Sequence, residues 1–213
     1  MSDQPADNEG RAFDRIEIVE VAVLALVAIA TAWSGYQATQ WGGRQALLYG
    51  QASTTRFAAD AASTRGGQFL VADSSMFTAW LQARATGDTQ LQAVLVRRFS
   101  PEYRVAFGAW LRTDPFTDPS APAGPGYMPG FSQPDLVLAK GLNDQASALF
   151  AEGTVARETA NKYVRDTVLF ATVLFLIAVA QRFRERRVRI GANALALSLL
   201  AYSLISVVIL QRA

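Results

Sequence analysis

The sequence contains no cysteine and no histidine. It therefore has no disulfide, no thiolate nucleophile, no imidazole base and none of the side chains that most often bind zinc, haem iron or copper. A glycine-rich phosphate loop, a nucleophile elbow and a spaced pair of catalytic carboxylates are also missing from the sequence. We therefore predict that the protein is not an enzyme, and we assign no catalytic residue, no cofactor and no metal.

Charged residues are few, because Asp, Glu, Lys and Arg make up 18% of the 213 residues while hydrophobic residues make up 51%. The net charge is only +2, and the basic residues are divided among separate segments. A nucleic-acid-binding protein would gather them into one basic surface, so we expect no nucleic acid partner. The apolar excess instead indicates a lipid bilayer, and the bias toward alanine and arginine is typical of a GC-rich bacterial genome.

Three apolar segments are candidates for crossing that bilayer: 21–38, 166–181 and 190–211. A hydrocarbon core of ~30 Å requires about 20 residues of helix. The second segment is shorter than this and must gain length from its flanks. A cleaved signal peptide is the competing interpretation of the first segment, but the N-tail 1–20 is acidic, whereas a signal peptide begins with basic residues.

The loop 182–189 orients the chain, because arginine-rich loops stay in the cytoplasm. The N-tail is then also cytoplasmic, and 39–165 lies on the extracytoplasmic side of a bacterial inner membrane. We expect Glu17 and Glu20 to neutralise part of the loop. The residues that determine this topology are Arg182, Arg184, Arg186, Arg187 and Arg189.

Apolar residues recur at helical spacing between the first two spans, and no segment alternates as a strand does. The pattern predicts an all-α fold: three transmembrane helices with an extracytoplasmic helical bundle inserted between the first and second spans. We expect the Gly66-Gly67 pair to end the first long helix and reverse the chain. The helices expected in this region are 34–64, 68–86, 88–99, 101–112 and 135–166.

The segment 113–134 is rich in proline and glycine, and it also contains Phe116, Tyr127 and Phe131. That composition excludes a helix, while the aromatic residues predict a cap packed onto the bundle. Asp114 and Asp118 each precede a proline. The first interpretation of this pattern is an ordinary turn, and the second is a calcium site.

Asp73 is the one charge in the middle of an apolar helical stripe. A buried carboxylate needs a partner. Arg84 follows on the same helical face. The first interpretation is a buried ion pair between Asp73 and Arg84, and the second is a ligand-binding site. Other arginines that could reach Asp73 are Arg56, Arg65 and Arg157.

Asp166 begins the second span, and counting residues up from the arginine loop places it level with Tyr36 and Gln37. One hypothesis is that this cluster binds Asp166; the alternative is a hydrated carboxylate at the membrane surface. Together with Trp33 and Trp41, these residues form a candidate interaction cluster. The first interpretation of its aromatic residues is an interfacial belt, and the second is a recognition site.

Small residues recur every four positions along the first long helix. Packing within one chain is the first interpretation of this row, and an interface between copies is the second. The residues are Ser34, Ala38, Gly42, Ala46, Gly50, Thr54, Ala58, Ala62 and Gly66.

Two motifs, Ala-Trp-Ser-Gly-Tyr-Gln-Ala at 32–38 and Ala-Trp-Leu at 109–111 with Thr-Asp-Pro-Phe at 113–116, resemble a family of uncharacterised bacterial three-span membrane proteins. The resemblance implies the same three-span architecture and no catalytic residue.

The first functional hypothesis is a non-enzymatic membrane scaffold or accessory subunit that packs with itself or with another membrane protein. The second is a membrane-anchored sensor or small-molecule-binding protein of unknown ligand, and the third is a channel or transporter subunit.

Overall fold

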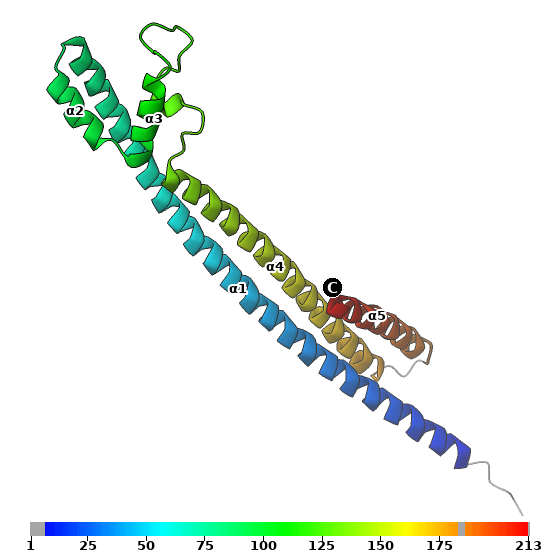
Figure 1. Cartoon of the computed structure of the whole chain (residues 1–213). Coiled ribbons are helices and arrows are strands. Elements are labelled where there is room, and N and C mark those ends of the chain that lie inside the picture. The colour runs from blue at the N-terminus through cyan, green and yellow to red at the C-terminus, as the bar shows by residue number, and fades with distance from the viewer. Residues whose placement is uncertain (1–6, 183–185, 213) are drawn as a thin grey trace, which may run out of the picture. The chain divides into compact units, whose positions relative to one another are not determined.

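The computed structural model describes the backbone of residues 7–182 and 186–212, with the side chains of 21–182, 190–192 and 194–209. These residues form helices and connections without a strand, so the predicted all-α fold is confirmed. Figure 1 labels the α-helices. In chain order the elements are α1 (Asp7–Ala85), α2 (Thr89–Arg98), α3 (Pro101–Leu111), the 3-10 helix η1 (Pro125–Tyr127), α4 (Pro134–Ala180) and α5 (Arg186–Arg212).

The first long helix does not end at Gly66-Gly67, and the prediction of a chain reversal there was wrong. Helix α1 is 79 residues long in total and continues through both glycines to Ala85. Two glycines cost a helix only about 1 kcal/mol each, which packing readily offsets. A Cβ at Gly66 would lie 2.9 Å from Leu136 Cδ2, so this glycine permits a close approach of α4. The chain turns instead just after Ala85, at Gly87, whose φ is +74°.

The chain divides into two compact units, which we describe separately. The membrane unit contains residues 1–49 and 151–213, and the inserted unit contains residues 50–150. Helices α1 and α4 each contribute to both units.

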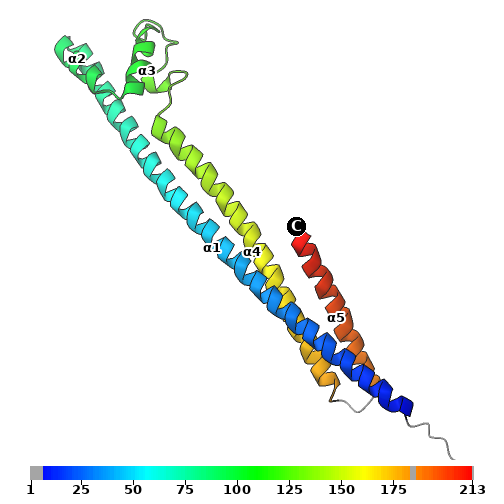
Figure 2. The same ribbon diagram turned by 60° about the horizontal axis from the view of Figure 1, so that its bottom comes forward.

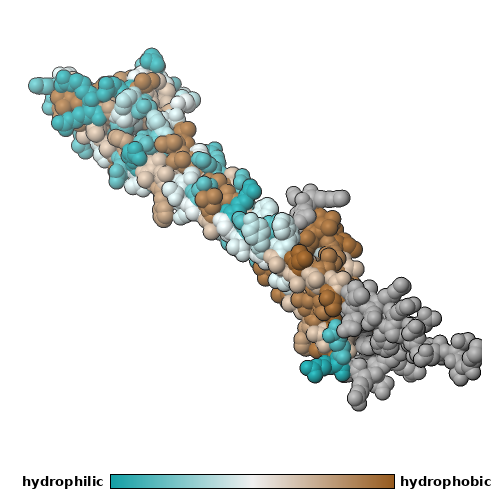
Figure 3. Space-filling view, turned by 90° about the horizontal axis from the view of Figure 1, so that it is seen from below, coloured by the Kyte–Doolittle hydropathy of each residue, from teal (hydrophilic) through white to brown (hydrophobic). Residues whose placement is uncertain are grey.

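Three helices are long and apolar enough to cross a membrane, within Val21–Ala85, Pro134–Ala180 and Ile190–Ile209. In the membrane unit they pack through one apolar cluster, and both ribbon views show them together (Figure 1, Figure 2). The exposed Ile29, Phe175 and Ile209 suit contact with lipid. Figure 3 shows hydrophobic residues gathered over these helices. The buried cluster is Val27, Phe170, Val173, Ile177, Ala196 and Leu200.

Helices α1 and α4 run antiparallel and touch where the membrane unit ends. The Tyr49 hydroxyl lies 3.2 Å from Thr154 Oγ1. A Cβ at Gly153 would lie 2.5 Å from the Tyr49 ring, so the missing side chain makes room for the aromatic ring. This contact fixes the register of the two helices.

The inserted unit is built around aromatic residues from α1, from α3 and from Phe99, which directly follows α2; α2 itself contributes Leu95. The Trp80 and Phe107 rings pack edge to face at 4.8 Å, and those of Phe77 and Trp110 at 5.1 Å. Such pairs stabilise a core beyond the area they bury. Phe69 and Leu91 belong to apolar stripes at helical spacing, which predict an inward position, but both residues are exposed. The buried cluster is Trp80, Ala83, Leu95, Phe99, Tyr103, Phe107 and Trp110.

The proline-rich segment packs onto this cluster as expected. Its carbonyl at Pro122 accepts a 2.7 Å hydrogen bond from Trp110 Nε1. The Phe131 ring meets Tyr103 at 5.6 Å, and Pro125 is buried. The segment is therefore an ordered cap with one short 3-10 turn.

Candidate functional site

Asp73 is only 3% exposed, as its position in an apolar stripe predicts. Its partner is Ser100: the Ser100 amide donates to Oδ1 at 2.9 Å, and the Ser100 hydroxyl donates to Oδ2 at 2.6 Å. Among the described residues the ion pairs are Arg65–Asp135 and Arg165–Asp166, so the predicted ion pair of Asp73 with Arg84 was wrong. Each carboxylate oxygen accepts a hydrogen bond from Ser100, so both are satisfied without an arginine. Hydrogen bonds to a carboxylate are stronger than those between neutral groups.

Ser100 also caps α3, because its hydroxyl accepts from the Tyr103 amide at 3.3 Å. Asp73 therefore lies at the positive end of the α3 dipole, where a negative charge is stabilised. Burial raises the pKa of Tyr103 to about 12, and the charge of Asp73 adds to the shift. This group of residues fixes α3 on α1, and its carboxylate is already occupied.

Arg84 does not reach Asp73 and is exposed. Its guanidinium lies 4.0 Å from the centre of the Phe116 ring and 5.7 Å from that of Trp80. Cation–π contacts of this kind stabilise exposed positions by about 0.5–1 kcal/mol. Arg84 thus holds the proline-rich cap against α1, so the candidate polar site of Asp73 and Arg84 is not assembled.

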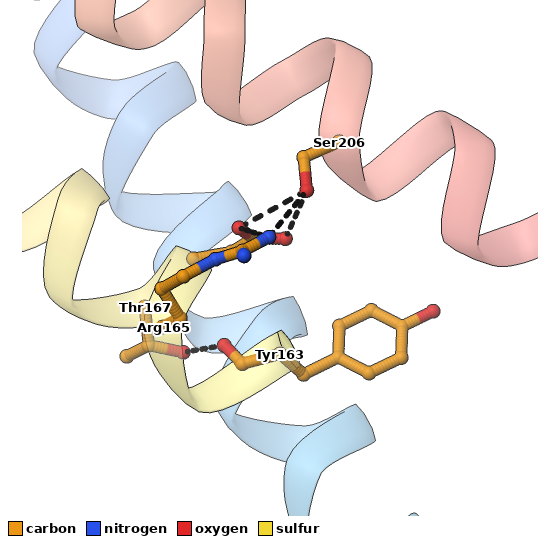
Figure 4. Close-up of polar contacts among 5 residues, drawn as sticks. Tyr163, Arg165, Thr167 and Ser206 are labelled. Atoms are coloured by element: carbon orange, nitrogen blue, oxygen red, sulfur yellow. Dashed lines mark hydrogen bonds and ion pairs between the residues drawn. The ribbon is translucent and has the colours of Figure 1, made fainter. Parts of the chain in front are cut away.

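Asp166 on α4 has no exposed surface. Ser206 on α5 donates to its carboxylate, with oxygen distances of 3.0 and 3.2 Å. The Arg165 guanidinium lies 3.7 Å from Asp166 Oδ1 and donates to Ser206 Oγ at 3.3 Å. Figure 4 shows these contacts, with Thr167 Oγ1 donating to the Tyr163 carbonyl beside them.

Neither interpretation of Asp166 made from the sequence holds. Tyr36 is 55% exposed, and its hydroxyl accepts from Gln40 Nε2 at 2.8 Å rather than contacting Asp166. The hydrated alternative fails because the carboxylate is buried. Helix α5 supplies the partner that α1 was expected to supply, since it packs on the same part of α4.

Sequence reasoning missed Ser206, although a signal for it was present. Asp166 lies 15 residues before Gln181, and Ser206 lies 16 residues after Ile190. Counting from the arginine loop along both spans therefore places the two side chains at one depth.

Two further hydroxyls are buried in the membrane unit. Ser34 on α1 and Ser203 on α5 have no exposed surface, and neither hydroxyl has a hydrogen-bond partner among the described residues. Ser203 precedes Ser206 by three residues and so lies on the same side of α5. Polar groups inside a membrane bundle are costly and commonly functional.

The residues of the candidate aromatic cluster are spread along α1, where Trp33 and Tyr36 are exposed and Trp41 is half-buried. The Trp33 and Tyr36 rings lie 6.0 Å apart, and Arg44 lies 5.5 Å from the centre of the Trp41 ring. Gln37 is half-buried. Exposed aromatic residues at the end of a span suit the interfacial belt. They do not share a site with Asp166.

The topology residues fall mostly outside the described side chains. Arg182 is exposed at the end of α4, and Arg184 lies outside the described residues. Arg186, Arg187 and Arg189 belong to the first turn of α5, without described side chains. The pairing of this loop with Glu17 and Glu20 also lies outside the described side chains and stays a prediction.

Asp118 accepts hydrogen bonds from the Ser120 amide at 2.8 Å and the Ser120 hydroxyl at 2.7 Å. These bonds lower the pKa of Asp118. The turn interpretation of this aspartate is confirmed. Within the described part of the chain no three acidic residues gather in a group able to bind a metal.

Comparisons with protein-family models, curated proteins and solved structures found no match. The resemblance to bacterial three-span proteins therefore stays a prediction.

Proposed function

We propose that the protein is an integral membrane scaffold or accessory subunit that acts by helix packing. The observation that carries the proposal is the exposure of large apolar side chains on helices outside the predicted spans. In the inserted unit Phe57 is 72% exposed, Val71 68% and Val137 58%. Large exposed apolar surfaces commonly mark interaction sites.

We infer the bacterial inner membrane as its location, with a cytoplasmic N-terminus and 39–165 on the extracytoplasmic side. The five arginines of 182–189 support this orientation. Under this topology, a partner would bind the protein on the extracytoplasmic side or within the bilayer.

Native mass spectrometry of the full chain in nanodiscs tests the proposal. We expect a complex of two or more copies, or a second protein that co-purifies in a fixed ratio. A monomer with no co-purifying protein, over a range of protein concentrations, would overturn the proposal.

A channel or transporter subunit is the second candidate, because one observation favours it. Asp166 is a buried carboxylate in the membrane unit, with the unpartnered hydroxyls of Ser34 and Ser203 in the same unit. Ion flux into proteoliposomes that is lost in Asp166→Asn would support this function, and absence of flux in the unmodified protein would exclude it.

The sensor hypothesis has less support. A ligand that binds Asp73 needs free carboxylate oxygens, but both oxygens already accept hydrogen bonds from Ser100. We keep it as an alternative without a ligand.

A further inference from the structure

We propose that two copies of the chain pair through one face of α1 in the inserted unit, with the two helices parallel. This inference rests on the proposed function and deepens it, because it names the partner and the surface. We call the surface the heptad face. Its residues are Gly50, Thr54, Phe57, Ala61, Thr64, Gln68, Val71, Ser75 and Thr78.

The heptad face follows alternating steps of four and three residues without a break. Steps that average ~3.5 residues keep a row on one side of a helix, as in a coiled-coil seam. The apolar residues of this row are Phe57, Ala61 and Val71, and the others are glycine or uncharged polar residues. Every position in the row is exposed, and none is charged. This differs from the row of small residues spaced by four, which winds around the helix.

The opposite side of α1 is the side that is buried within the chain. Ala52 is 5% exposed, Ala59 has no exposed surface and Gly66 contacts Leu136. These three residues occupy the heptad position furthest from the seam, given that Phe57 and Thr64 lie on it. The chain's own packing therefore leaves the heptad face open.

Phe57 and Val71 are the anchors of this face. They are 72% and 68% exposed and lie 14 residues apart, which is two heptads, so they occupy equivalent positions. A shallow hollow of about 330 Å³ lies beside Val71, lined also by Leu70, Ser74, Ser75 and Thr78. The small residues Ala61 and Thr64 between the anchors allow two backbones to come close. In a parallel pair each anchor meets its own equivalent.

Charge favours a second copy over an unrelated helix, and favours the parallel orientation. Asp60 and Arg65 flank the face on opposite sides, five residues apart. In a parallel coiled coil, residues at these two positions meet across the seam. Asp60 is exposed and has no ion pair in the described chain, and Arg65 stays 58% exposed while pairing with Asp135 at 3.7 Å.

An antiparallel pair would instead place like charges together. Two copies inserted in one membrane have the same orientation, and a two-fold axis along the membrane normal makes their α1 helices parallel. The membrane and the charge pattern therefore select the same arrangement.

Single-cysteine cross-linking tests the arrangement, because the chain has no cysteine of its own. Thr64→Cys places the thiol on the heptad face, and Ser63→Cys is the matched control, one residue away on the same exposed helix. In the full-length protein in membranes under a mild oxidant, we expect Thr64→Cys to form a disulfide dimer at least tenfold faster. Equal rates, or no dimer at Thr64→Cys, would overturn the inference.

Phe57→Asp in the Thr64→Cys background tests the anchor. We expect at least a tenfold loss of cross-linking, whereas Val105→Asp, which alters a residue of α3 that is 75% exposed, leaves the rate unchanged. Circular dichroism shows whether each variant stays folded. Equal effects of the two folded variants would count against the heptad face.

The two proposals fail in different ways. A dimer or a co-purifying protein in native mass spectrometry, without the Thr64→Cys cross-link, leaves the scaffold and removes the heptad face. A monomer without a partner removes both.

Discussion

The hydroxyl of Ser206 on α5 lies 3.0 Å from one carboxylate oxygen of Asp166 on α4 and 3.2 Å from the other. The hydroxyl donates its one hydrogen to a carboxylate that has no exposed surface. This contact joins α5 to α4. The apolar residues Phe170, Ala196 and Leu200 belong to one buried cluster that packs the same two helices together.

Ser206→Ala should therefore weaken the membrane unit. Removing the hydroxyl leaves a buried carboxylate short of a donor, and we expect a loss of about 1–3 kcal/mol in the free energy of unfolding. Thermal or denaturant unfolding in detergent measures it. Ser198→Ala is the control, because Ser198 is exposed and bonds only to the Leu195 carbonyl. Equal losses in both variants would contradict the assigned role of Ser206.

Ser100→Ala should destabilise the inserted unit. The substitution removes the side-chain cap of α3, and it also leaves the buried carboxylate of Asp73 with one hydrogen-bond donor fewer. We therefore expect a loss of about 2–4 kcal/mol in the free energy of unfolding. Ser100→Thr keeps the hydroxyl and should retain most of the stability. Chemical unfolding followed by tryptophan fluorescence reports on this unit through Trp80 and Trp110. A threonine variant as unstable as the alanine variant would show that the hydroxyl is not the cause.

Tyr103 predicts how stability changes at alkaline pH. Burial raises its pKa from 10.0 to about 12 in the folded chain. The unfolded chain therefore releases this proton first, so the contribution of Tyr103 is complete below pH 10 and is lost as the pH rises toward 12. We expect Tyr103→Phe to reduce the fall in stability between these two values. Tyr127→Phe, at a residue 76% exposed, is the control and should follow the unmodified protein.

Single cysteines also test the topology. A membrane-impermeant maleimide added to intact cells should label Ser132→Cys, which lies in 39–165, and should label Val188→Cys only after the membrane is opened. This expectation follows from the proposed orientation, which puts the arginine-rich loop 182–189 in the cytoplasm. The reverse labelling pattern would invert the proposed orientation.

The sequence predicted those features that depend on neighbouring residues. The predicted helix 88–99 is present as α2, and Asp88 caps it by accepting from the Leu91 amide at 2.9 Å. Such a cap requires only a side chain and the turn that follows it. Ser100 and Pro101 likewise begin α3 where they were predicted to. The proline-rich cap and the helix that leads into the second span were also predicted correctly.

Partners from distant segments were not predictable in the same way. Asp73 was assigned an arginine because a buried charge calls for an opposite charge, but the start of α3 supplies two hydrogen bonds instead. The partner of Asp166 was expected on α1 because Tyr36 and Gln37 lie at its depth, whereas Ser206 of the third span lies at that depth as well and is the actual partner. The burial of Asp73 was predictable from its apolar stripe, whereas that of Asp166, which follows Arg165 at the start of a span, was not. For both residues the partner depended on how helices far apart in sequence pack.

Gly66 and Gly67 are identical neighbours with unequal freedom to vary. A methyl group at Gly67 would meet nothing within 4 Å, whereas at Gly66 it would lie 2.8 Å from Gln133 Oε1. That oxygen already accepts from the Leu136 amide at 3.0 Å, so it cannot move away without uncapping α4. Natural variation should therefore accumulate at Gly67, where alanine favours the helix, and should be excluded at Gly66.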